Sequence, residues 1–304
     1  MAKDKLKNMR LAMEKDLAEL FKHIREQNFG SEEELQKFLN EAVVGKKLGE
    51  ILPPQKGKKS NAEKAQDLLL EAFAVAPRKG AKLAQEAIKL DPNNADAYVY
   101  LAANEKSVGK AIQYYTKGLE AGKRAIGAKD FEEFKGHFWG FHETRPFMRA
   151  KAGLASCLYL TGQVEEAINH YQEMLVLNSD DNQGIRYQLA ICLVEQNKAE
   201  AFEKLYKTYQ SDSSAVFQYT YALYLFKKEG SSLKSNRALK KAYETNPHVM
   251  AFLTGEKMVP DYLPDFMGRG DENEAIFCIN DSGRIWQKTP GAMEWAREFY
   301  RKQK

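Results

Sequence analysis

Apolar positions along this chain recur with a period of about 34 residues, a spacing typical of stacked helical repeats. In the stretch AIKLDPNNADAYVYLA (87–102), Pro92 ends one helical pattern, and the next pattern carries Tyr98 and the pair Leu101 and Ala102. The same arrangement begins near residues 61, 95, 148, 183 and 216, so the steps are 34, 53, 35 and 33 residues. Within each step the apolar residues lie three and four positions apart, which predicts two helices per unit.

Both ends of the chain depart from this repeat. Apolar residues from Leu6 to Ile24 follow a helical spacing, and Ser31 with Glu34 predicts the start of a second helix. Beyond residue 254, prolines and glycines interrupt the pattern, and Thr289 before Pro290 predicts the start of a last helix. We therefore predict an all-α protein. It consists of a helical hairpin or cap (1–52), a tetratricopeptide solenoid (61–254) and a helical extension (255–304).

The one long step contains an insertion at about 122–147. Four phenylalanines recur there at helical spacing, namely Phe131, Phe134, Phe138 and Phe141. Four exposed phenylalanines would form an apolar patch that soluble monomers seldom carry. The spacing therefore predicts one helical face, mostly buried against the second and third repeats.

Two stretches of the chain resemble a known family. GHFWGFHETRPFMRAKAGLASCLYLTGQVEEAINHYQEML (136–175), followed by LNSDDNQGIRYQLA (177–190), is similar to bacterial tetratricopeptide proteins of the suppression-of-tumorigenicity family. The tail DENEAIFCINDSGRIWQKTPGAMEWAREF (271–299) resembles the end of the same proteins, so the resemblance covers residue 61 to the C-terminus. It implies no catalytic residue. Eukaryotic members are membrane-associated, but this chain lacks their membrane helices.

Tetratricopeptide arrays bind partners on a concave face formed by the first helix of each unit. The corresponding positions here are Val99, Ala103, Arg149, Ala152, Ser156, Tyr159, Tyr187, Ile191, Phe217, Thr220 and Tyr224. Tyrosine combines a large contact area with a polar group, as interface hot spots do. We therefore predict a groove that binds a protein or peptide segment. The lysine that clamps chaperone tails is replaced by Ala152 and Tyr187, which argues against that ligand.

Polar and aromatic residues gather at the end of the insertion. This possible subsite contains Trp139, His142, Glu143 and Arg145, together with Arg149, and Arg186 follows in a similar stretch. Arginine binds carboxylates well, which favours an anion or peptide subsite. The alternative is an ion pair between Glu143 and Arg145 or Arg149 that locks the insertion onto the third repeat.

Metal binding is not expected in the insertion. His137 and His142 lie five residues apart, or roughly 140° around a helix, so they do not share a face.

Composition narrows the function further. The net charge of +4 is spread along the chain, which argues against nucleic acid, and no apolar run is long enough to cross a membrane. The N-terminus lacks the apolar region of a secretory signal, and the three cysteines lie in apolar helical patterns, so we expect a cytoplasmic protein with free thiols. No motif indicates a cofactor.

We therefore expect a non-catalytic binding scaffold and no enzymatic activity. One alternative is a structural or self-assembly protein, in which the extension or the N-terminal hairpin fills the groove of its own chain or, in a homo-oligomer, of a neighbouring chain. A third reading is an unrecognised small-molecule enzyme around His142, Glu143 and Arg145.

Overall fold

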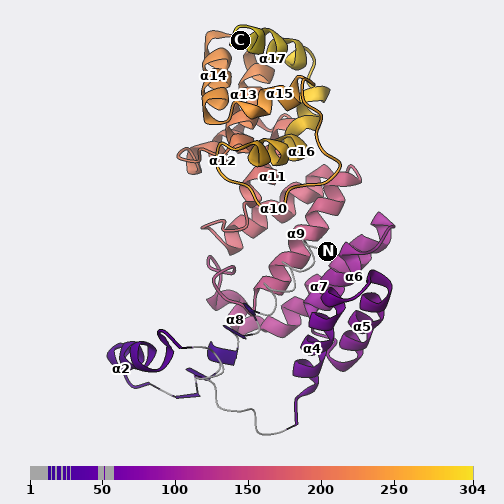
Figure 1. The fold of residues 1–304 in the computed structure, drawn as a ribbon, viewed down its shortest axis with the longest axis vertical. Helices are drawn as coiled ribbons and strands as arrows, with labels where there is room; N and C mark the ends of the chain where they lie inside the picture. The colour runs from indigo at the N-terminus through magenta and orange to yellow at the C-terminus, as the bar shows by residue number, and fades with distance from the viewer. Residues whose placement is uncertain are drawn as a thin grey trace. The chain divides into compact units, whose positions relative to one another are not determined.

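The computed structural model describes residues 13, 14, 16, 17, 19–21, 23, 24, 26, 27, 29–46, 51 and 58–303. Within this described part the chain is helical, with two isolated bridges that pair Gly136 and His137 with Asn178 and no strand (Figure 1). The prediction of an all-α protein is therefore confirmed. No helix among these residues combines the length and apolar character needed to cross a bilayer.

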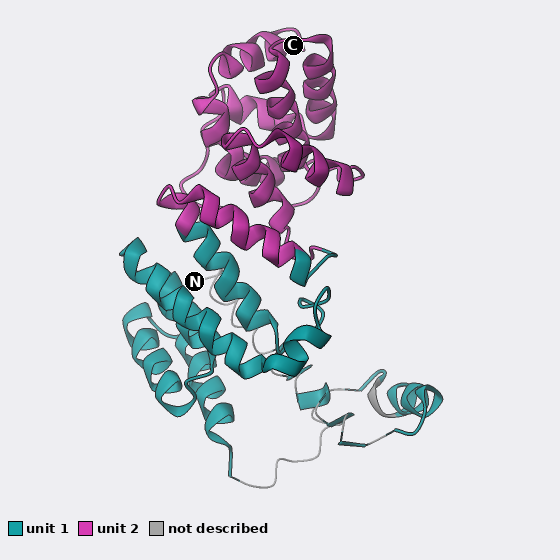
Figure 2. Cartoon of the chain, turned by 180° about the vertical axis from the view of Figure 1, so that it is seen from behind, with its two compact units in different colours: residues 1–157, 176–180 teal, residues 158–175, 181–304 magenta. Residues whose placement is uncertain are grey.

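The chain groups into two compact units, shown in different colours in Figure 2. Unit 1 comprises residues 1–157 and 176–180, and unit 2 comprises residues 158–175 and 181–304. The division between them falls inside a helix that begins at Arg145. The boundaries drawn from the sequence at residues 52, 61 and 254 stay a prediction.

Unit 1 is built from helices that pack on their neighbours in the sequence. Its helices are α2 (Glu32–Phe38), the π-helix η1 (Leu39–Val43), α4 (Asn61–Ala74), α5 (Pro77–Leu90), α6 (Ala95–Ala103), α7 (Val108–Ile126), α8 (Ala128–Glu133) and the greater part of α9 (Arg145–Leu160). Helix α4 packs on α5, α5 on α6, and α6 on α7. The hydroxyl of Ser31 accepts a hydrogen bond from the backbone N–H of Glu34, which confirms the predicted start of α2.

Glycines permit the closest of these helix contacts. Gly80 lies against Tyr100, whose hydroxyl donates to the carbonyl of Ala72 at 3.0 Å. A Cβ added at residue 80 would lie 1.9 Å from that hydroxyl oxygen, so no larger residue fits without a shift. Gly153 faces the ring of Tyr115 in the same way, which brings α9 close to α7.

The phenylalanine run of the insertion does not form one helical face. Helix α8 ends at Glu133, and the chain then turns irregularly to the start of α9. Only Phe138 is fully buried, where its ring contacts Phe131 and Phe147. Phe134 stacks on Phe141, which is 37% exposed. The prediction of one helical face is therefore wrong, because the helix ends before Phe134, Phe138 and Phe141, although none of the four rings is more than 37% exposed.

Unit 2 continues with further helix pairs. Its helices are α10 (Val164–Leu177, up to residue 175), α11 (Ile185–Glu195), α12 (Ala199–Thr208), α13 (Ala215–Glu229), α14 (Leu233–Thr245), α15 (His248–Leu253), α16 (Glu272–Lys288) and α17 (Ala292–Arg301). The final helix does not begin at Thr289. Thr289 follows the end of α16, where its hydroxyl donates to the carbonyl of Ile285, and Gly291 at φ 78° precedes α17. Glycine tolerates this left-handed conformation, so the chain reverses there.

Candidate protein-interaction surfaces

Helix α16 of the C-terminal extension packs on the first helices of the last two helix pairs of unit 2. It contacts both α11 and α13. Its buried residues include Ile276, Cys278, Ile285 and Trp286, and the Trp286 ring lies 6.4 Å from that of Tyr219 on α13. The chain's own extension therefore covers part of the surface on which a ligand was expected.

Polar contacts hold α16 at three further points. At its start, the carboxylate of Glu274 accepts the backbone N–H of Ala215 at 3.0 Å, at the first turn of α13. In its middle, Gln188 donates to Asp281 at 3.0 Å. At its end, Lys288 pairs with Glu195 at 2.6 Å. Because these contacts reach from one end of α16 to the other, the whole helix is fixed in place.

Burial divides the residues predicted to line the groove. Ile191, Phe217 and Thr220 are fully buried, and Tyr224 is only 6% exposed. The rings of Phe217 and Tyr224 pack on Tyr206 and Phe202 of α12. These four side chains therefore offer little surface to a partner in this structure, and their role in a groove stays a prediction. Half-buried positions are Val99, Arg149, Ala152, Tyr159 and Tyr187, and exposed positions are Ala103 and Ser156.

The two half-buried tyrosines of unit 2 already have partners within it. The Tyr159 hydroxyl donates to Glu195 at 2.7 Å, and the Arg284 guanidinium of α16 lies 5.6 Å from its ring. The Tyr187 hydroxyl donates to Asp212 at 3.0 Å, and its ring lies 6.2 Å from that of Phe217. Burial raises the pKa of both hydroxyl groups. Both rings remain partly accessible, so their role in binding a partner stays a prediction.

Arg186 is the centre of a compact ion-pair cluster at the start of α11. It pairs with Asp181 at 2.8 Å and with Asp212 at 2.6 Å, and its guanidinium lies 4.2 Å from the Tyr187 ring. Burial would raise the pKa of Asp212, but hydrogen bonds from Ser214 and Arg186 outweigh it and lower the pKa. Asp181 also accepts the backbone N–H of Ile185 at 2.7 Å and so caps the helix. These contacts join the loops before α11 and α13.

In unit 1, two arginines on one face of α9 hold carboxylates. Arg149 forks onto Asp96 at 2.8 and 2.6 Å, and its remaining nitrogen Nη1 donates to both oxygens of Glu14, at 3.0 and 2.9 Å. Arg145 donates to the same Glu14 at 3.3 Å and to the carbonyl of Trp139 at 2.9 Å. Burial disfavours the charged form of Arg149, but Asp96 and Glu14 outweigh it and raise its pKa.

The structure brings Trp139, His142 and Glu143 of the predicted polar subsite near these arginines, whereas Arg186 belongs to unit 2. His142 Nδ1 lies 3.1 Å from the Glu143 carboxylate, and the Arg145 guanidinium lies 5.6 Å from the Trp139 ring. The carboxylates that Arg149 holds are Asp96 and Glu14, residues that sequence reasoning missed because they lie 53 and 135 positions away. A separation of that size leaves no local signal in the sequence.

The most exposed apolar stretch in the described part of unit 2 is MVPDYLPDFM, residues 258–267, which we call the 258–267 segment. Met258 is 91% exposed, and Tyr262 and Phe266 are each 78% exposed. A four-residue pattern of two apolar residues, a proline and an aspartate occurs twice in succession, as MVPD (258–261) and YLPD (262–265). The apolar pair Phe266 and Met267 follows. This short repeat was visible in the sequence. Its prolines, however, predict only irregular chain.

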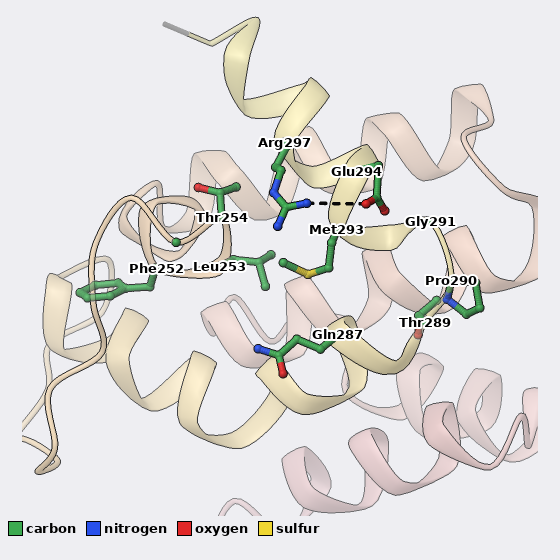
Figure 3. A pocket seen from close by; sticks show the side chains of 11 residues that line it. Phe252, Leu253, Thr254, Gln287, Thr289, Pro290, Gly291, Met293, Glu294 and Arg297 are labelled. Carbon is green, nitrogen blue, oxygen red and sulfur yellow. Dashed lines mark ion pairs between the residues drawn. The ribbon is translucent and has the colours of Figure 1, made fainter.

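Beside the start of this segment lies an open cavity of about 530 Å³ between α15, α16 and α17. Its lining includes Leu253, Met293 and Arg297, and Figure 3 shows Arg297 directed toward Glu294, with which it pairs at 3.6 Å. The lining combines a few apolar side chains with one neutralised ion pair. It therefore has no unpaired charge that would select a ligand.

Reactive chemistry is not apparent in the residues that the structure describes. No group of three potential metal ligands occurs among them. All three cysteines are free, and burial raises the pKa of Cys192 to about 12 and also raises the pKa of Cys157 and Cys278. Thiols with raised pKa are poor nucleophiles at neutral pH.

No protein-family model matches the chain, and no curated protein matches its sequence. The resemblance to the suppression-of-tumorigenicity family therefore stays a prediction from the residues quoted above.

Proposed function

We propose that this chain is a non-catalytic protein-binding scaffold that presents the 258–267 segment to a partner protein. The observation that carries the proposal is the run of exposed apolar side chains from Met258 to Met267. Large apolar side chains left exposed in succession mark interaction sites more often than chance surface. We place the partner here and not on α11 and α13, because α16 covers those helices.

The backbone of the segment is held at both ends, which favours recognition. Before it, Lys257 pairs with Glu272 at 2.8 Å, which ties the two ends of the loop together. After it, the Asn273 side chain donates to the carbonyl of Phe266 at 3.0 Å. Pro260 and Pro264 restrict the backbone further. A segment whose backbone is already restricted loses less entropy on binding than a free one.

The chemistry of the segment indicates the kind of partner. Asp261 and Asp265 are both exposed and each follows a proline. A partner that accommodates Tyr262 and Phe266 therefore needs apolar pockets with basic residues beside them. These carboxylates would be repelled by an anionic membrane surface, so we favour a protein partner.

A photocrosslinking amino acid at Tyr262 of the full-length chain tests this proposal in cells. We expect a discrete crosslinked product, because Tyr262 would lie inside the interface. Replacing Asp261 and Asp265 by lysine should abolish the product while the circular dichroism spectrum stays unchanged. The matched control places the same amino acid at Leu233, which is 69% exposed at the start of α14. Identical products from both positions, or products that survive the charge reversal, would contradict the proposal.

A structural or self-assembly role is the second candidate. It is favoured by α16, since a groove filled by the chain's own extension has less surface left for a peptide. In that case the chain would act as a rigid spacer or would associate with further copies. Sedimentation of the full-length chain over a range of concentrations distinguishes this role, which requires self-association that survives replacement of Tyr262 by serine.

We also propose that the helix pairs are tetratricopeptide units and that the protein works in the cytoplasm. The 34-residue period and the close glycine contacts at Gly80 and Gly153 support the first point. Three free thiols without a disulfide support the second.

A further inference from the structure

We propose that Arg145 and Arg149 of α9 form a carboxylate-binding site for an amphipathic helix that carries a glutamate, and that the chain's own N-terminal helix, whose described residues lie between Met13 and Glu26, occupies it through Glu14. This site lies in unit 1 and is separate from the 258–267 segment, so it adds a second binding surface to the one proposed above.

The geometry is that of a two-arginine clamp. Residues four apart on a helix lie on one face, so both guanidinium groups of α9 point to the same place. Oε1 of Glu14 accepts from Arg145 at 3.3 Å and from Arg149 at 3.0 Å, while Oε2 accepts from Arg149 at 2.9 Å. Several charge-assisted hydrogen bonds on one carboxylate give strength and fixed orientation.

The charges of the cluster require a second carboxylate. Asp96 is 6% exposed and takes the Nε and Nη2 edge of Arg149, which leaves Nη1 and the charge of Arg145 for another anion. Without Glu14, these groups would carry one net positive charge at a site where both arginine side chains are about one-fifth exposed. A partly buried charge without a partner is costly, so the site favours an anionic occupant.

Among the described residues of the N-terminal helix, Glu14 and Phe21 contact this site. Phe21 lies seven residues after Glu14, and therefore about two turns along the same face, where its ring stacks on His142 at 5.8 Å. Apolar residues of this helix remain accessible, since Met13 is 56% and Leu17 is 38% exposed. Contacts that bury little apolar surface open at low free energy, so another helix can displace this one.

The ligand class follows from the occupant. It is a helix with a glutamate that reaches both arginines and an aromatic residue two turns later that reaches His142. An isolated anion such as acetate supplies only the first of these contacts, so the helix adds the specificity.

The experiment titrates the full-length chain with a fluorescein-labelled peptide of residues 5–28 and follows fluorescence anisotropy. In the wild-type chain, the covalently attached helix competes at an effective concentration in the millimolar range. Glu14→Arg in the chain places a third cation at the clamp and expels the chain's own helix. We expect this variant to bind the peptide at least tenfold more tightly than the wild-type chain does.

Three controls make the result decisive. The chain variant Glu26→Arg, at an exposed position of the same helix, should bind the peptide no better than wild type. A peptide with Glu14→Gln should bind the Glu14→Arg chain at least tenfold more weakly than the native peptide. If Glu14→Arg does not fold, the milder chain variant Glu14→Gln replaces it with the same expected order of affinities. Equal binding of both peptides, or no binding to any folded variant, would overturn the proposal and leave Glu14 as a structural lock.

Discussion

Two surfaces of this protein are occupied by its own chain, but by opposite means. In unit 2, α16 covers α11 and α13 mainly with apolar side chains such as Ile285 and Trp286, both almost fully buried. In unit 1, the described contacts of the N-terminal helix with α9 are centred on one carboxylate, Glu14, between two arginines. The first contact is broad and apolar, and the second is small and polar.

This difference indicates which of the two covering helices stays bound and which can be displaced by a ligand. Apolar burial contributes free energy in proportion to area, so removing α16 would expose a large part of the core of unit 2. A partly exposed ion pair contributes far less, and salt screens it. The comparison therefore predicts that α16 is part of the fold, whereas the N-terminal helix is a ligand carried by the chain.

The largest expected effect comes from Trp286→Ala. Its ring packs between Tyr219 and Trp295, 6.4 and 5.9 Å away, so the truncation leaves a cavity in the core of unit 2. We expect a loss of about 3–5 kcal/mol in the free energy of unfolding, measured by urea denaturation. Gln287→Ala, at the exposed neighbouring position, should change it by less than about 0.5 kcal/mol. Equal and small effects would mean that α16 is not part of the core.

The next effect concerns Arg149→Ala, which tests the polar surface of unit 1. This change removes the fork from the buried carboxylate of Asp96 as well as a contact to Glu14. We expect a loss of about 2–3 kcal/mol, because a buried acceptor with a charge is left without its donor. Arg145→Ala removes a contact to Glu14, one to the Trp139 carbonyl and the contact with the Trp139 ring, and should cost about 1 kcal/mol. If Arg145→Ala lowers the free energy of unfolding as much as Arg149→Ala does, the N-terminal helix is as much a part of the fold as α16.

The sequence predicted the helices better than it predicted their partners. Helical spacing located the pairs from α4 to α14, and Ser31 located the start of α2, because these signals are local. The same spacing predicted a phenylalanine helix that is longer than the one observed. Phe138 lies in a turn, where its ring is buried against Phe131 and Phe147. Thr289 does not begin the last helix, as its position before Pro290 predicted. Its hydroxyl instead donates to the Ile285 carbonyl at the end of α16.

The candidate site was predictable only in part. Arginine and aromatic residues at 139–149 marked the polar cluster correctly as a place of ion pairs. The identity of the paired carboxylates depends on packing between segments far apart in the chain, so Asp96 and Glu14 could not be found from spacing. For the same reason, helical spacing alone does not predict the burial of Ile191 and Thr220.

A smaller effect is expected at Tyr187, which tests whether a predicted groove position of α11 is structural. Tyr187→Ala would remove the contact with Phe217, the stacking on Arg186 and the hydrogen bond to Asp212. We expect a loss of about 2 kcal/mol in thermal unfolding. Tyr187→Phe keeps the ring and should lose only about 1 kcal/mol. An unchanged melting temperature for the alanine variant would restore Tyr187 as a free binding residue.

The smallest effect is a pH dependence at Asp281, where α16 meets α11. Burial raises the pKa of this carboxyl group, although donors from Asn280 and Gln188 partly oppose the shift. The folded state therefore binds the proton more tightly than the unfolded state does. As the pH rises from the ordinary carboxylate pKa, about 3.9, through the raised folded pKa, this group makes the free energy of unfolding fall. Asp281→Asn removes the titration and keeps an acceptor for Gln188. In urea denaturation at a series of pH values, the asparagine variant should gain stability relative to wild type across that window, and parallel curves would show that α16 is insensitive to this charge.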